Sequence, residues 1–214
     1  MSTELGLRES KKQETRQLIS DCATRLFIEQ GFEQTTIAEI AAAARVAKKT
    51  VTNYFPRKED LALDHHEAFT QSLAAAVADR APGEGPLAAL GRAFHATLVG
   101  HSPVAGFTGP EFARMVADSP TLSARLRELH DQREEALAAA LASVTPDTAP
   151  AIAPRAAAAL IAASDRLLFR RIQELTLAGR TDDEIEAVLT PEANHAHALL
   201  TAALGDYPTT PAAP

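Results

Sequence analysis

The chain has 214 residues, and its 21 lysines and arginines against 28 aspartates and glutamates give a formal net charge of −7 at pH 7. Its single cysteine, Cys22, excludes an internal disulfide and fits a reducing compartment. The sequence has no run of about 18 apolar residues and no apolar signal core at its N-terminus, so we expect a cytoplasmic protein without a membrane span.

The acidic net charge argues against a nucleic-acid-binding protein, but the charges are unevenly distributed. All five lysines lie within the first 58 residues. Residues 1–60 hold ten basic and nine acidic side chains, a net +1, whereas residues 61–214 hold eleven and nineteen, a net −8. A near-neutral head with clustered lysines on an acidic body indicates one end that faces DNA and a body that does not.

The first sixty residues predict a helix-turn-helix. An amphipathic helix ends at Gly31, and Thr36 with Glu39 forms a T-x-x-E capping box that opens a second helix over about 37–43. A tight turn then leads to a third helix over about 47–55. This arrangement places the third helix in the major groove of DNA.

The outward face of the third helix is basic and polar. Periodicity buries Val51 and Phe55 and leaves outward Lys48, Lys49, Thr52 and Asn53, with Thr50 near the edge. Lysine can donate to guanine or phosphate, asparagine can pair with adenine, and threonine can touch a base edge or a thymine methyl group. The alternative is an ordinary helical hairpin with a solvated charged face.

The segment VAKKTVTNYFPRKEDL (46–61) resembles the signature of TetR-type (tetracycline-repressor-like) transcription regulators, a family of all-helical proteins. It has the valine turn, the short recognition helix that ends in Tyr-Phe, and the Lys-Glu-x-Leu opening of a fourth helix. The resemblance is close over about residues 10–61. It implies phosphate contacts by Thr36, Tyr54 and Lys58. It also implies base or backbone contacts by Lys48, Lys49, Thr50, Thr52 and Asn53.

Three positions depart from the family pattern. Arg45 stands where glycine is common in the turn, and a positive φ there costs on the order of 1 kcal/mol. Ala47 replaces the usual serine cap of the recognition helix, a loss of about 1 kcal/mol. Thr52 replaces a frequent tyrosine, so the base preference of the family does not transfer directly.

The rest of the chain has the periodicity of helices separated by Pro/Gly-containing breaks. We expect helices over about 57–79, 86–99, 111–117, 119–143, 150–178, 181–189 and 191–204. The sequence therefore predicts an all-α fold in three parts. Residues 1–56 form a helix-turn-helix DNA-binding domain with a flexible N-terminal arm, residues 57–205 form a helical ligand-binding and dimerisation bundle, and residues 206–214 form a disordered tail.

The stretch AAAALIAASDRLLF (156–169) is apolar nearly all round, which fits either a dimer interface or a central core helix. The resemblance favours the interface, because members of the family dimerise through their last two long helices. A homodimer with two reading heads also matches a palindromic DNA operator.

Chemistry elsewhere in the chain is sparse. In Asp64-His65-His66-Glu67 and in His195-x-His197 the neighbouring side chains point to different helix faces, so we expect no metal site. There is no G-x-S-x-G elbow and no glycine-rich phosphate loop, so we expect neither an enzyme nor a cofactor.

The resemblance also implies a small apolar ligand inside the body. Residues that could line its pocket are Phe69, Phe94, His95, Leu98, Phe107, Phe112, Met115, Arg166 and Phe169, with Arg114, Leu137 and Asp165 as further candidates. The alternative for each aromatic side chain, and the more common case in proteins, is an ordinary core position. The body from Glu111 onward is also similar to TetR-type regulators suspected of binding acyl-chain or acyl-CoA-like ligands.

These features predict a homodimeric, ligand-responsive regulator of transcription that acts as a repressor. Two alternatives stay open: a DNA-binding regulator controlled by a protein partner, and an enzyme that merely contains a helical hairpin.

Overall fold

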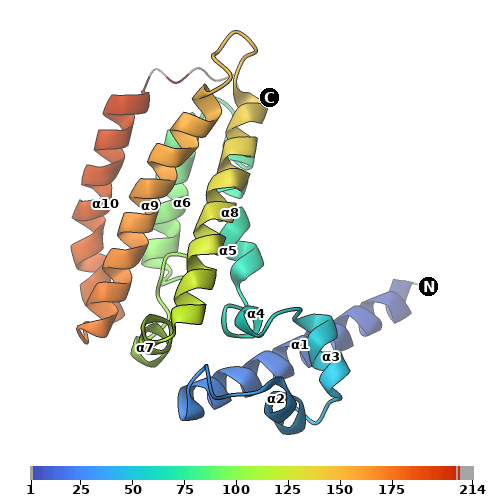
Figure 1. Cartoon of the computed structure of the whole chain (residues 1–214). Coiled ribbons are helices and arrows are strands. Elements are labelled where there is room, and N and C mark those ends of the chain that lie inside the picture. The colour runs from blue at the N-terminus through green and yellow to red at the C-terminus, as the bar shows by residue number, and fades with distance from the viewer. Residues whose placement is uncertain (1, 206, 208–214) are drawn as a thin grey trace. The chain divides into compact units, whose positions relative to one another are not determined.

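The computed structural model describes residues 2–205 and 207, with side chains from Ser10 onward. Its regular elements are all α-helices, so the predicted all-α fold is confirmed over this part of the chain (Figure 1). They are α1 (Ser2–Gln30), α2 (Ile37–Ala43), α3 (Lys48–Tyr54), α4 (Lys58–Ala62), α5 (His66–Ala78), α6 (Pro86–Val99), α7 (Pro110–Asp118), α8 (Pro120–Val144), α9 (Ala153–Leu177) and α10 (Asp182–Leu204).

The chain divides into two compact units. The first unit comprises residues 1–64 and 114–126, and the second comprises residues 65–113 and 127–214. Helix α8 therefore supplies its first turns to the first unit and the rest of its length to the second. Residues 206 and 208–214, most of the predicted tail, lie outside the described residues.

The first unit is built around α1, which packs against α2 and α4, while α2 packs against α3. Its core contains the fully buried side chains of Ile19, Phe27, Ile40 and Phe55. The segment before about residue 10, predicted as an arm, has a helical backbone from Ser2.

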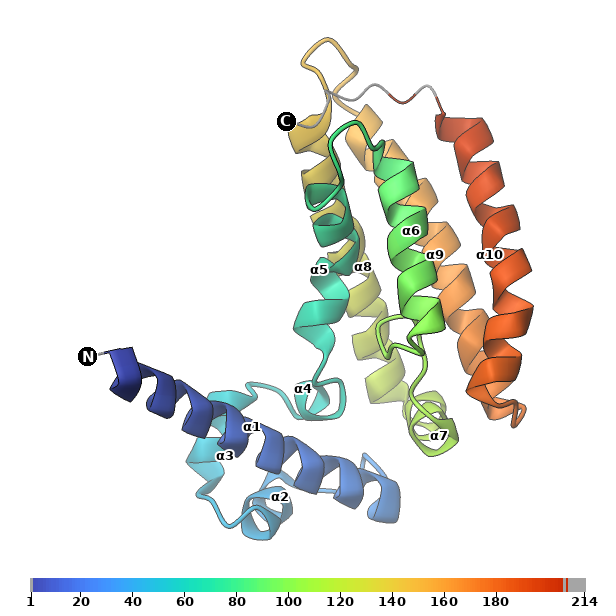
Figure 2. The same cartoon turned by 180° about the vertical axis from the view of Figure 1, so that it is seen from behind.

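The second unit contains long helices that run side by side (Figure 2). Helix α10 packs along both α9 and α6, and α5 packs along α6. Two apolar clusters fill this unit, one centred on Phe94 and Ile172 and one on Leu137 and Ile161. No helix in the described part of the chain is long and apolar enough to cross a membrane.

The helix predicted over 57–79 is broken in the structure. Helix α4 ends where Leu63 leaves the helical region (φ −105°, ψ 52°), and α5 begins after His65. Ser20 donates a hydrogen bond to the Asp64 carboxylate at 2.5 Å, which ties the break to α1. His65 is consequently an exposed residue at the start of α5 and not part of an apolar face.

The two helices predicted over 181–204 are one helix, α10, with Pro191 inside it. Proline lacks the N–H that the preceding turn needs, a defect worth about 3 kcal/mol in a helix interior. Thr190 donates its hydroxyl to the Glu186 carbonyl at 2.8 Å, and Leu189 and Ala193 on either side are buried in the core. Tertiary packing therefore holds the helix together where local sequence predicts a break.

Candidate functional site

The helix-turn-helix has the local features that the sequence predicts. The Thr36 hydroxyl accepts from the backbone N–H of Glu39 at 3.3 Å, and the Glu39 carboxylate accepts from the N–H of Thr36 at 2.8 Å, so the capping box is confirmed. Arg45 has φ 54°, and Ala47 gives α3 no side-chain cap. The turn thus keeps its strained backbone without glycine, as expected.

Helix α3 has one buried and one exposed face. Val51 is buried, as is Phe55 directly after the helix. The exposed side chains are Lys48, Lys49, Thr52 and Asn53, while Thr50 and Tyr54 are half-buried. Thr36, at the start of α2, is exposed as well. All of these candidate DNA-contacting residues therefore retain surface that a duplex could reach.

Arg16 of α1 fixes the end of α3, a contact that sequence periodicity does not predict. Its guanidinium donates to the Tyr54 carbonyl at 3.1 Å and lies 4.3 Å from the centre of the Phe55 ring. A charge-assisted hydrogen bond and a cation–π contact together hold the recognition helix at a defined orientation on α1.

Lys58 has an internal partner. Its ammonium donates to the Phe32 carbonyl and lies 4.2 Å from the centre of the Phe32 ring. Burial lowers the pKa of Lys58, against the opposing attraction of Glu33. The side chain thus fastens the segment after α1 to the start of α4, and its predicted phosphate contact stays a prediction.

Two further bonds anchor the first turns of α8 inside the first unit. Ser119 donates its hydroxyl to Glu33 at 2.6 Å. This bond is the main reason that the pKa of Glu33 lies below its ordinary value. Arg125 forms a buried ion pair with Asp60 of α4, with 2.9 Å between Arg125 Nη2 and Asp60 Oδ1. The start of α8 is thereby a part of the helix-turn-helix unit.

The second unit contains a partly open cavity of about 70 Å³, called the body cavity below. Its walls come from α5, α6, α8, α9, α10 and the loop between α6 and α7. The apolar lining residues are Leu73, Leu87, Leu90, Ala93, Phe94, Val104, Ala105, Ile161, Leu168 and Leu200. The polar ones are Ser72, Thr97, Arg133, Ser164, Asp165 and His197.

Of the nine residues predicted to line a pocket, Phe94 lines this cavity, as does the further candidate Asp165. The other eight do not line it. Phe69 and Phe169 enclose the His130 ring, and Leu98 and Phe107 belong to the core. His95 is exposed, Phe112 is half-buried, Met115 belongs to the first unit, and Arg166 forms ion pairs with Asp131 and Glu134. Sequence periodicity places an aromatic residue on an inner face but does not distinguish a filled core from a cavity wall.

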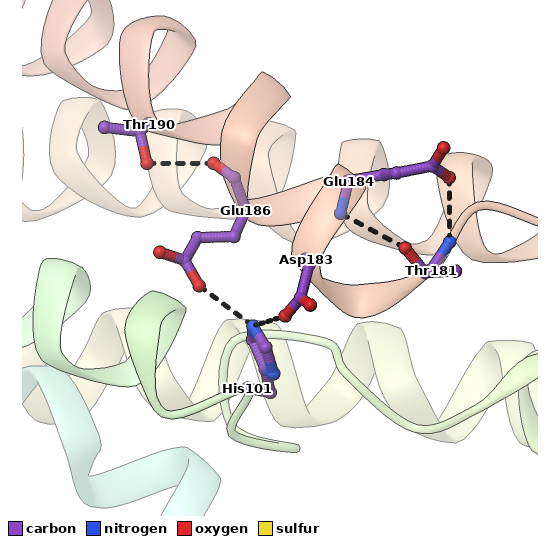
Figure 3. A network of polar contacts seen from close by, with 6 residues as sticks. All are labelled: His101, Thr181, Asp183, Glu184, Glu186 and Thr190. Atoms are coloured by element: carbon purple, nitrogen blue, oxygen red, sulfur yellow. Dashed lines mark hydrogen bonds and ion pairs between the residues drawn. The ribbon is translucent and has the colours of Figure 1, made fainter.

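The loop between α6 and α7 is tethered to α10 (Figure 3). His101 Nε2 lies 2.9 Å from Glu186 Oε2 and 3.9 Å from Asp183 Oδ1. The His101 ring also packs against Phe107, with 5.0 Å between ring centres. Because Val104 of this loop lines the cavity, the tether holds one wall in place.

Helices α9 and α10 carry exposed apolar side chains. Leu160 and Leu167 of α9 are 50% and 57% exposed, and Leu199 of α10 is 60% exposed. A spacing of seven residues puts Leu160 and Leu167 on one helix face. Leu168, by contrast, is 4% exposed and belongs to the core.

No group of three or more His, Cys, Asp or Glu side chains in the described residues is arranged to hold a metal ion.

A helix-turn-helix with an exposed polar recognition helix, joined to an all-helical body, defines the class of helix-turn-helix transcriptional regulators. Residues 19–64 match the sequence family described as bacterial regulatory proteins, tetR family. Residues 19–64 therefore carry the DNA-binding domain of the TetR family of transcriptional regulators.

One relative and two solved structures resemble the chain beyond the matched segment. The chain is 34% identical over 143 residues to the HTH-type transcriptional regulator TcmR of Streptomyces glaucescens. That match spans 64% of this chain and 63% of TcmR, less than two thirds of its length. The structure resembles that of a SmeT–triclosan complex (TM-score 0.55, 18% identity, 94% of this chain and 98% of that one). It also resembles a TetR-family regulator of Streptomyces coelicolor A3 (TM-score 0.53, 21% identity, 88% and 96%). At such identities the two structures establish the fold alone.

Proposed function

We propose that the chain is a DNA-binding repressor that acts as a homodimer on a palindromic operator and is released from it by a small, mainly apolar molecule. The observation that carries this proposal is the exposed face of α3, which presents Lys48, Lys49 and Asn53 together on a helix fixed by Arg16. The match of residues 19–64 to the TetR family supports a role in transcription.

The side chains on α3 divide the work of recognition. Asn53 is suited to a bidentate pair with adenine, and Lys48 and Lys49 to guanine or phosphate. Thr50 and Thr52 add contacts to base edges or a thymine methyl group. The hydroxyls of Thr36 and Tyr54 contact phosphates and set the register of the protein on the duplex.

The exposed leucines of α9 and α10, called the leucine stripe here, support the homodimer. Leu160, Leu167 and Leu199 would leave water when two copies meet there, at about 25 cal/mol per Å² of apolar surface. A symmetric pair carries two reading heads, as a palindromic operator requires.

A single charge on the leucine stripe tests the dimer. Leu167→Glu should give a monomer in light scattering at micromolar concentration and lose most operator affinity, because one head makes about half of the contacts. The matched control is Val99→Glu, which places the same charge at another exposed apolar side chain, at the end of α6 and away from α9 and α10 in the sequence. If Leu167→Glu stays dimeric, the interface lies elsewhere. Leu168→Glu would be uninformative, because that side chain belongs to the core of one copy.

The body cavity supports release by a ligand. SmeT, which shares the fold, is known in complex with triclosan, a small molecule. A ligand releases DNA only if it binds the DNA-incompetent state more tightly, and a hundredfold shift needs a coupling of about 2.7 kcal/mol.

The size of the cavity keeps one alternative open. About 70 Å³ is well below the roughly 300–1,000 Å³ of pockets for drug-sized ligands. This observation favours control by a protein partner if no small molecule proves active. Anisotropy of a labelled operator, titrated with apolar compounds, decides between them: release by a compound supports the sensor, and unchanged operator binding across the panel supports the partner.

A further inference from the structure

The wall of the body cavity contains an ion pair whose two charged groups are bonded to each other. Arg133 of α8 donates through Nη1 to Asp165 Oδ2 of α9 at 2.5 Å and through Nε to Ser72 Oγ of α5 at 2.9 Å. The two charged side chains are 6% and 12% exposed. Because opposite charges meet at bonding distance, the pair contributes no net charge to the cavity.

The cavity lining has one more titratable side chain, His197 of α10. Its ring meets the Phe94 ring edge-on, with 5.8 Å between their centres. Burial lowers the pKa of His197, with Asp165 opposing the shift, which favours the neutral form of the ring. A neutral imidazole offers one donor and one acceptor. The lining therefore carries no net charge when the His197 ring is neutral.

A neutral lining discriminates against anions. A carboxylate or phosphate in this space would have no cation of its own, because Arg133 is already bound to Asp165. Burying an unpaired charge costs several kcal/mol. A purely apolar molecule fits the leucine and phenylalanine walls but would cover the remaining acceptor sites of the Asp165 carboxylate without satisfying them.

We propose that this cavity takes a neutral, mainly apolar molecule that carries a hydroxyl group, an alcohol or a phenol, whose O–H donates to the Asp165 carboxylate. This inference rests on the proposed function, in which the body senses a ligand. It replaces the acyl-CoA-like ligand that the resemblance implied, since an acyl-CoA brings several phosphate charges that this lining does not balance.

The body cavity is too small for a ring-sized ligand as it stands. A cavity of about 150 Å³ holds one benzene ring, and this one is about 70 Å³. A ring-sized ligand must therefore enlarge it by moving its walls. One of those walls is α8, which carries Arg133 in the cavity and Arg125 in the helix-turn-helix unit. Binding is thus tied to a change in the helix that both units share.

Three probes that share an ethylbenzene frame and differ at the para position test the ligand class on the purified full chain without DNA: 4-ethylphenol, ethylbenzene and 4-ethylbenzoate. Calorimetric titration should give the phenol at least a tenfold tighter dissociation constant than either of the others, the effect of about one charge-assisted hydrogen bond. Tighter binding of the benzoate, or no binding of the phenol, would overturn the proposal.

The variant Asp165→Asn should bind an anionic probe more tightly than the wild-type protein does. It leaves Arg133 as an unpaired cation, so the preference should invert to 4-ethylbenzoate. Glu135→Gln, an exposed change on α8, is the matched control and should keep the preference for the phenol. An Asp165→Asn protein that is folded by circular dichroism and still prefers the phenol would contradict the role of Asp165.

A second variant covers the case in which Asp165→Asn does not fold. The pair Arg133→Met with Asp165→Leu replaces the ion pair by apolar groups of similar size, which proteins tolerate. It should bind ethylbenzene at least as tightly as the phenol, and a retained preference for the phenol would overturn the proposal. Operator binding is measured separately without probes. Probe binding without operator binding would remove the proposed function alone, and the reverse would remove this inference alone.

Discussion

The Arg125 guanidinium holds the Asp60 carboxylate through two nitrogens, with Nε 3.1 Å and Nη2 2.9 Å from the same oxygen, Oδ1. The side chains are 10% and 7% exposed, so the pair is shielded from water. It joins α4, directly after the recognition helix, to the first turns of α8. Eight residues further along α8, Arg133 lines the body cavity. One helix thus connects the two candidate sites.

We expect Arg125→Met to lower the free energy of unfolding by about 3 kcal/mol, because it leaves the Asp60 carboxylate buried with one partner fewer. Chemical denaturation measures this. The double variant Asp60→Leu/Arg125→Met should recover most of that stability yet respond less to ligand, since the bond between α4 and α8 is gone. A double variant whose operator release matches the wild type would show that α8 does not transmit the signal through this pair.

Lys58→Ala should lower the free energy of unfolding by about 1–2 kcal/mol, through loss of the hydrogen bond to the Phe32 carbonyl and the contact with its ring. Unfolding in urea is the measurement. Unchanged stability, together with a shallower dependence of operator affinity on salt, would instead assign Lys58 to the phosphate contacts.

His130 gives the second unit a dependence on pH. Its ring lies between Phe69 and Phe169, and burial, with repulsion from Arg133, Arg166 and Arg170, lowers its pKa to about 3. Between about pH 6.5 and pH 3 the unfolded chain binds a proton that the folded chain does not. Stability is therefore complete above about pH 6.5 and falls with pH below it.

At pH 5 the loss from His130 amounts to about 2 kcal/mol. His130→Leu should flatten the dependence between pH 7 and pH 5, measured by denaturation at both values. A wild-type protein and a variant with parallel pH profiles would show that His130 takes up its proton without cost.

The helix-turn-helix could be predicted from sequence because its signals are local. Thr36 and Glu39 are three residues apart, and the Arg45 turn and the inner positions of α3 follow from short-range periodicity. Such features depend on neighbours within a turn of helix, which the sequence displays directly.

Contacts between distant residues set the remaining features. The break after α4 depends on Ser20 and Asp64, 44 residues apart, and the charge pair of the cavity joins side chains 32 residues apart. Periodicity also gave no reason to separate exposed Leu167 from buried Leu168, since an all-apolar helix has no polar face to orient it. The cavity and the exposed leucines of α9 could therefore be identified only from the structure.

The most direct test of the account is selection of DNA by the purified protein from a pool of random-sequence duplexes. We predict enrichment of a palindromic site to which the protein binds with an affinity that falls steeply with salt. The preferred bases should change with Asn53→Ala. They should stay the same with Glu29→Ala, an exposed change on α1. No enriched sequence, or the same preferred bases with Asn53→Ala, would contradict the claim that the exposed face of α3 reads DNA.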